Sequence, residues 1–315
     1  MPAAPDDDAR PAWLGLVQVT LAGLLWGTIG VGVKLVRRHA LLPVLMIGAY
    51  RAVIASVVLT AVVLVTRRRP TVRRMLSHHA MPAISVGVLT GAFQVLYFIS
   101  LVTANVSIAT VISLGVAPLL VTSVTGIRER SMPARRHVTS VVVALTGLAL
   151  VSGASHGAHE TPHPAIGIVT AIGSGVCYGA ATMLAEPLTR TFDAISVTAV
   201  TTPAAAVAVV PVAVIAAVGG GDRLVTSNPA AMSLLVYLGV VTTALAYALL
   251  YAGLRTTRSG VAVIATLLEP VAAVLLAAAI LDERLSTLGL VGSGLILAAI
   301  AVLGSVPDEP EPVSQ

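Results

Sequence analysis

Long apolar stretches without charged residues dominate the chain. Between Arg74 and Arg128, for example, there is no Asp, Glu, Lys or Arg. A helix needs about 20 apolar residues to cross a hydrocarbon core of ~30 Å, so this stretch is long enough for two membrane spans. Clusters of Gly, Pro, Ser and charged residues divide the apolar stretches into ten predicted helices. They cover residues 13–36, 43–66, 80–102, 105–126, 134–152, 165–188, 194–218, 230–253, 259–281 and 286–306.

Composition supports an all-α integral membrane protein. Hydrophobic residues make up 57% of the chain and charged residues only 10%, which is far from an ordinary soluble domain. The opening residues, MPAAPDDDARPAW, are acidic where a secretory signal would be basic. No cleaved signal is therefore predicted.

The distribution of Lys and Arg predicts the orientation. With the N-terminus inside, thirteen Lys and Arg lie in the interior segments and five in the exterior ones, while Arg51 falls within a span. Positively charged loops stay in the cytoplasm, so both termini are expected there, in a multi-pass protein of the plasma (inner) membrane. The segment RRRPTVRR (67–74) then faces anionic lipid headgroups rather than nucleic acid.

The second half of the sequence repeats the first. A shift of 152 residues aligns Trp26 with Tyr178, Gly27 with Gly179 and Pro118 with Pro270 without a gap. Each half holds five predicted spans, and an odd number makes the second copy enter the membrane from the opposite side. Inverted repeats of this kind are typical of secondary transporters, although a duplicated scaffold without transport remains an alternative.

The expected fold is therefore ten transmembrane helices in two inverted five-helix repeats (5+5). We expect a disordered cytoplasmic N-terminus at 1–12, the first repeat at 13–152, an external connector at 153–164, the second repeat at 165–306 and a disordered cytoplasmic tail at 307–315.

Several segments resemble the EamA family of the drug/metabolite transporter (DMT) superfamily. They are LLWGTIGVGVKL (24–35), YRAV (50–53) and LEPVAAVLLAAAILDERL (268–285), together with the doubled five-helix pattern. The resemblance covers roughly residues 13 to 306. It implies a transporter of amino acids, related metabolites or drugs. In one respect the two halves differ, because Ala117 stands where the second half has Glu269.

Glu269 is the most unusual residue of the predicted spans. It lies about ten residues into its helix, at a depth of ~15 Å and thus near the middle of the membrane. A charge there costs roughly 2.5 to 3.5 kcal/mol and persists when it is paired, protonated or in contact with water. We expect Glu269 to bind substrate or a proton, with a purely structural tie between helices as the alternative.

Two prolines at equivalent positions are candidate hinges. Pro270 removes a backbone donor, so the carbonyl of Thr266 is expected to lack its helical partner, and Pro118 has the same effect on Leu114. Simple packing of kinked helices is the alternative.

Other polar and aromatic residues are candidates for the wall of a central cavity. Arg51 is isolated within a span and suits a carboxylate, although it could also pair with an acid or reach the membrane surface. Helical spacing gathers Gln94 and Tyr97 on one helix and Tyr247 on its repeat equivalent. The full set of cavity candidates is Trp26, Arg51, Gln94, Tyr97, Tyr178, Tyr247 and Glu269.

Motifs for other chemistries are missing from the sequence. There is no nucleotide-binding loop, nucleophile elbow or HExxH, so no enzyme activity and no cofactor are expected. His156, His159 and His163 lie in the connector between the repeats, where a flexible loop is the simpler interpretation than a metal site.

The resulting hypothesis is a secondary active transporter that exports a small metabolite by alternating access with proton coupling. Its expected partners are a small-molecule substrate, the lipid bilayer and protons, with a homodimer left open and nucleic acid excluded. Facilitated diffusion, substrate exchange and a non-transporting scaffold are the alternatives.

Overall fold

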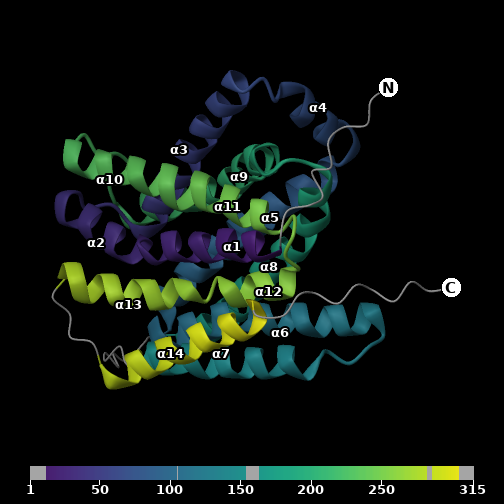
Figure 1. Ribbon diagram of the computed structural model, residues 1–315. Helices are drawn as coiled ribbons and strands as arrows, with labels where there is room; N and C mark the ends of the chain where they lie inside the picture. The colour runs from purple at the N-terminus through teal and green to yellow at the C-terminus, as the bar shows by residue number, and fades with distance from the viewer. Residues whose placement is uncertain (1–11, 105, 154–162, 282–285, 305–315) are drawn as a thin grey trace.

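The protein folds into a bundle of long helices, described here from a computed structural model of residues 12–104, 106–153, 163–281 and 286–304. Figure 1 shows most of the helices running side by side across the molecule. The helices are α1 (Ala12–Gly27), α2 (Ile29–His39), α3 (Val44–Val65), α4 (Arg69–His78), α5 (Ala80–Thr103), α6 (Val106–Glu129), α7 (Arg135–Gly153), α8 (Pro164–Thr191), α9 (Ala194–Gly220), α10 (Pro229–Gly239), the π-helix η2 (Val240–Leu245), α11 (Ala246–Gly253), α12 (Ser259–Ala265), α13 (Leu268–Leu281) and α14 (Thr287–Gly304).

The ten predicted spans are confirmed. Within the described residues, ten helical stretches are long and apolar enough to cross a membrane. Their ends lie within a few residues of the predicted ones, as in the second span, predicted at 43–66 and observed at Val44–Val65. Many large apolar side chains are exposed on the outside of the bundle, for example Val57 and Val207, as expected for helices that contact lipid.

Three spans are interrupted near their middle, and the sequence predicted a kink in only one of them. Span 1 breaks at Thr28 between α1 and α2, and span 9 breaks at 266–267 between α12 and α13. Span 8 contains the six-residue π-helix η2 between α10 and α11. Interrupted spans recur at the binding sites of secondary transporters, because their backbone groups become available at membrane depth.

Packing between the halves follows the inverted repeat. Span 1 packs against spans 8 and 9, and its counterpart α8 packs against α5 and α6, the third and fourth spans. Spans 2 and 7 pack against each other, as do spans 5 and 10. The α1–α13 contact is close because a Cβ at Gly27 would lie 2.8 Å from the carbonyl of Glu269. At the equivalent place, a Cβ at Gly179 would lie 3.3 Å from the carbonyl of Ala117. The structure is thus two inverted five-helix repeats.

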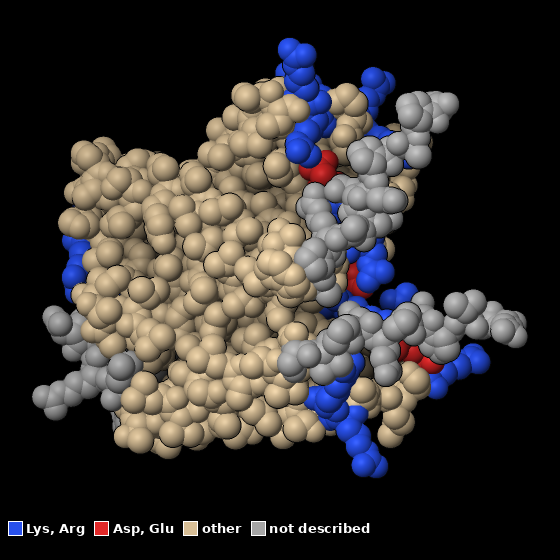
Figure 2. Space-filling view, viewed as in Figure 1, with Lys and Arg blue, Asp and Glu red and all other residues tan. Residues whose placement is uncertain are grey.

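The arginine-rich end of the molecule is called the basic face below. It holds α4, the α6–α7 connector and the ends of α8 and α11, and Gly304 at the end of α14 lies against Leu16 of α1 there. Figure 2 shows Lys and Arg gathered along this edge, beside a broad band without charged side chains. Such a band matches the hydrocarbon core of a membrane.

Candidate functional site

The interrupted spans meet at Trp26, the next-to-last residue of α1. The indole Nε1 of Trp26 donates a hydrogen bond to the carbonyl of Thr242 at 3.0 Å, inside the π-helix η2. From α8, the hydroxyl of Tyr178 donates to Oγ1 of Thr266 at 2.9 Å, at the break in span 9. Side chains of spans 1 and 6 therefore bind the breaks of spans 8 and 9, and the contact of Trp26 with Thr242 joins the two halves of the chain.

An aromatic cluster surrounds this meeting point. The ring of Trp26 lies 5.1 Å from that of Tyr247 and 6.3 Å from that of Tyr178, measured between centroids. Phe93 of α5 lies 5.1 Å from Tyr178 and 6.1 Å from Tyr97. Four of the predicted cavity residues are thereby brought into one continuous cluster of rings from α1, α5, α8 and α11.

Arg51 and Glu269 are the charged residues beside this cluster. Arg51 of α3 interacts electrostatically with both Glu269 and Tyr247, and Glu269 interacts in turn with Tyr97 and Tyr178. These partners come from α3, α5, α8 and α11, so the carboxylate of Glu269 is directed into the bundle. Among the residues that the structure describes, no ion pair within 4.0 Å joins Arg51 to Glu269. The two opposite charges thus face one region without neutralising each other directly.

Arg51 is buried without a full set of partners. Its side chain is 5% exposed, and its Nε is buried without a hydrogen-bond partner. A buried donor without a partner costs about 1–3 kcal/mol, and more when it is charged. An arginine in this state is suited to bind a carboxylate or another planar anion, to which it would donate hydrogen bonds.

Glu269 is partly exposed and lies in the first turn of α13. A negative charge is stabilised at a helix N-terminus by the helix dipole, by about 0.3–1 kcal/mol and more in partly buried sites. The break in span 9 therefore helps to explain how an acid is tolerated at this depth.

Gln94 has a buried position on α5, one residue beyond Phe93. It lies on the same face as Thr90, one turn before it, whose hydroxyl lies beside that of Tyr251. Gln94 therefore belongs to the inner face of α5 but is not part of the ring cluster itself.

The two prolines differ in their surroundings. Pro270 follows the break in span 9, as expected for a kink, but the carbonyl of Thr266 is not free, because the backbone N–H of Glu269 donates to it at 2.9 Å. Pro270 cannot supply the usual helical donor to this carbonyl, as predicted, but the chain tightens into a turn in which Glu269 supplies a closer one. Pro118 lies within the continuous helix α6.

Sequence reasoning did not identify Thr242, Thr266 and Phe93 as part of this site. The hydrogen bonds from Trp26 and Tyr178 reach across 216 and 88 residues. A π-helix leaves no dependable sequence signature, and only Pro270 gave a local signal for a nearby break. Phe93 could have been found as a neighbour of the polar stripe on α5.

A second feature lies at the basic face. A pocket of about 650 Å³ is bordered by the α6–α7 connector, the end of α8 and the start of α12. On its wall, Oε2 of Glu186 accepts a hydrogen bond from the backbone N–H of Ser259 at 2.9 Å, and Oε1 binds Arg190 at 2.8 Å. Arg258 also approaches Glu129 at 3.7 Å. The contact between Glu186 and Ser259, called the α8–α12 latch below, closes the gap between these helices.

No metal site is found among the described residues, where no three His, Cys, Asp or Glu side chains gather. His156 and His159 of the connector lie outside the described residues. Cys177 of α8 is a free cysteine.

Comparisons with known proteins agree with this architecture. The sequence model of the EamA-like transporter family matches residues 13–153 and again 165–305. An uncharacterized transporter, YwfM of Bacillus subtilis (strain 168), is 24% identical over 290 residues, covering 92% of this chain and 93% of its own. One solved crystal structure aligns with a TM-score of 0.74 at 18% identity, covering 91% of this chain and 96% of that chain.

Proposed function

The chain belongs to the EamA-like transporter family, and from this premise we propose that it is a proton-coupled exporter of a small zwitterionic metabolite. Its class as a multi-pass membrane transporter follows from the family and from the ten spans.

The separation of Arg51 and Glu269 is the observation that carries the proposal. Two opposite charges face the same aromatic cluster but form no ion pair with each other among the described side chains. A zwitterion such as an amino acid carries both complementary charges at a short separation. Its carboxylate would bind Arg51, its amine would bind Glu269, and its apolar part would pack on the rings of Trp26 and Tyr178.

Proton coupling would use the same carboxylate. A proton and a substrate amine cannot both neutralise Glu269, so each would displace the other. During export, Glu269 would bind the substrate amine from one side of the membrane. It would release the amine when a proton binds to it from the other side. Ala117 occupies the equivalent place in the first half, so one acid would carry one coupling step.

Alternating access would depend on the α8–α12 latch. Tyr178, Thr182 and Glu186 follow each other at four-residue spacing on α8, so the latch lies two turns from the aromatic cluster on the same helix face. Separation of Glu186 from Ser259 would extend the pocket at the basic face toward Tyr178. Pro118 and the break before Pro270 are the proposed hinges of spans 4 and 9.

The basic face is the proposed cytoplasmic face of the plasma membrane. Arginines are concentrated there, and positively charged segments remain on the cytoplasmic side. The start of α1 and the end of α14 lie at this face, which supports cytoplasmic termini.

Exchange of anionic substrates without protons is a second candidate. The unpartnered Nε of Arg51 favours it, because a buried cation suits a carboxylate or phosphate on either side of the membrane.

Transport by purified protein in liposomes tests both candidates. We expect uptake of a zwitterionic metabolite, identified from a labelled panel, that is stimulated by an opposing pH gradient. Counterflow without any effect of pH would support exchange instead. Absence of flux across the whole panel would favour a non-transporting scaffold and contradict the proposal.

A further inference from the structure

The helix α4 is a feature of the first repeat alone. Its residues 69–76 have residues 221–228 as repeat equivalents, but these form a turn and a segment without regular secondary structure. Five arginines lie in α4 or immediately before it, each at a position whose equivalent in the second repeat is not basic: Arg67, Arg68, Arg69, Arg73 and Arg74. Because the equivalent connector is not helical, the architecture alone does not require a basic helix here.

One face of α4 is anchored to the bundle. Met75 is fully buried against the core, and α4 packs against α5 and the start of α9. Arg68, just before α4, forms an ion pair with Asp193. His79, just after it, lies 5.2 Å from the ring of Phe192. The orientation of the helix is therefore set at both of its ends.

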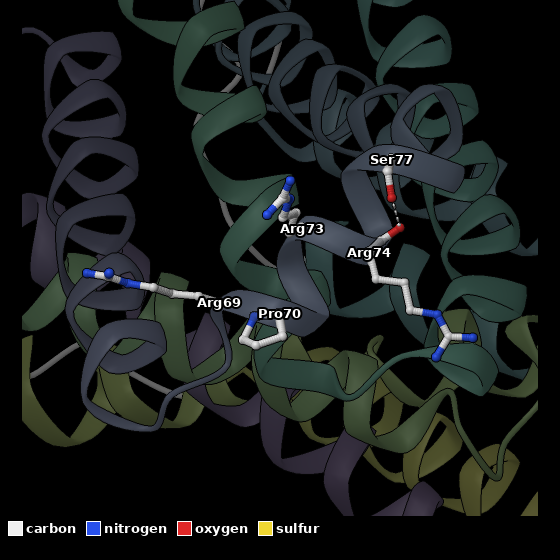
Figure 3. A pocket seen from close by; sticks show the side chains of 5 residues that line it. All are labelled: Arg69, Pro70, Arg73, Arg74 and Ser77. Carbon is white, nitrogen blue, oxygen red and sulfur yellow. Dashed lines mark hydrogen bonds between the residues drawn. The ribbon is translucent and has the colours of Figure 1, made fainter.

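The opposite face of α4 is a basic stripe. Arg69, Pro70, Arg73, Arg74 and Ser77 line a shallow depression of about 610 Å³ at the basic face. Figure 3 shows the guanidinium groups of the three arginines pointing in different directions rather than toward one point. Ser77 donates its hydroxyl to the carbonyl of Arg74 at 3.0 Å, so its Oγ–H is already used. This arrangement suits several neighbouring anions better than a single chelated one.

Exposed apolar side chains surround the stripe. Val65 and Met81, at the flanks of α4, are 81% and 79% exposed, and Leu76 of α4 itself is partly exposed. Apolar side chains beside arginines are typical of a helix at the boundary between acyl chains and headgroups, where long basic side chains reach outward to the headgroups.

We propose that this face of α4 binds anionic phospholipid headgroups of the adjacent leaflet. Its arginines are fixed toward the boundary by the anchored face, and none of the five residues that line the depression is acidic. Each basic residue near an anionic membrane contributes about 1 kcal/mol, which corresponds to roughly a fivefold change in affinity. Because the guanidinium groups of Arg69, Arg73 and Arg74 point in different directions, they contact several headgroups at once. Free phosphate therefore does not substitute for the lipid.

Lipid titration of the full-length protein tests the proposal. Detergent-solubilised protein is titrated with phosphatidylglycerol or phosphatidylcholine, and bound lipid is counted by native mass spectrometry. The variant R73Q/R74Q removes two charges from the stripe. The matched control R37Q/R38Q removes an adjacent pair of exposed arginines at the end of α2. A third variant, R73K/R74K, keeps the charge.

We expect wild-type protein to prefer phosphatidylglycerol and R73Q/R74Q to lose roughly 25-fold in affinity for it, while R37Q/R38Q and R73K/R74K change by less than about threefold. Unchanged thermal midpoints would show that the variants fold. The proposal is overturned if wild type binds both lipids equally, if both glutamine pairs lose affinity to the same degree, or if an excess of inorganic phosphate displaces the lipid.

Discussion

The carboxylate of Glu186 accepts a hydrogen bond from the backbone N–H of Ser259 at 2.9 Å, across 73 residues of sequence. Ser259 is the first residue of α12, so its N–H lacks an intrahelical acceptor. The contact both caps α12 and joins it to α8. Its removal should therefore loosen the α8–α12 gap without disturbing the core of either helix.

Opening of the latch can be followed at Thr182, one turn inward from Glu186 and only 2% exposed. In a Cys177→Ser background, we expect a cysteine introduced by Thr182→Cys to react slowly with a membrane-impermeant reagent. The additional change Glu186→Ala should raise that rate about tenfold, because a charged hydrogen bond of about 1.5–3 kcal/mol is lost. Glu129→Ala is the control, since its exposed pair with Arg258 is worth about 0–1 kcal/mol. Equal acceleration by both changes would argue against the latch.

Glu269→Gln should abolish the stimulation of transport by a pH gradient while the protein remains folded. The amide keeps the shape of the carboxyl group but cannot bind and release a proton. Flux into inverted vesicles, measured with and without a gradient, checks this outcome. Glu129→Gln serves as the control because its side chain is exposed at the basic face. A response of Glu269→Gln to pH equal to that of wild type would assign coupling to another group.

Arg51→Gln should raise the KM for a carboxylate substrate by roughly 10- to 100-fold, the loss expected for a hydrogen bond between charged groups. Because Nε of Arg51 has no partner in the structure, the variant should not unfold more easily. Substrate concentration series and thermal midpoints separate the two effects. A large drop in the midpoint with an unchanged KM would instead mark Arg51 as a structural residue.

Gly27→Ala and Gly179→Ala compare equivalent positions of the two repeats. A Cβ at Gly27 would lie 2.4 Å from Cβ of Ala272 and 2.8 Å from the carbonyl of Glu269, so the α1–α13 contact must separate. Overpacking of this kind costs typically about 1–3 kcal/mol. At Gly179 the nearest atom belongs to the flexible side chain of Leu120, at 3.1 Å. Thermal unfolding should show a clear loss for Gly27→Ala and little for Gly179→Ala.

Several features of the fold could be predicted from the sequence because they depend on local composition. A span requires a certain length of apolar residues, so the ends of α3 and α5 were close to their predicted positions. The repeat is visible in pairs such as Gly27 and Gly179. Each of them packs the first span of one repeat against the fourth span of the other repeat. Glu269 was recognisable as a candidate because an acid at membrane depth is costly wherever it points.

The site depended on contacts that no local pattern encodes. Trp26 and Thr242 lie 216 residues apart, and their hydrogen bond exists only because α1 passes the π-helix of span 8. The alignment of the repeats likewise gave no sign that residues 69–76 form a helix while 221–228 do not.

The sequence by itself thus determined the spans, their number and the inverted repeat, since hydrophobic length and residue order are properties of the chain. Only the tertiary structure decided where spans 1 and 8 break, which side chains bind those breaks and how Glu186 meets Ser259. Those features arise when helices distant in sequence pack together, because the hydrogen bonds that stabilise them are made between elements rather than within one.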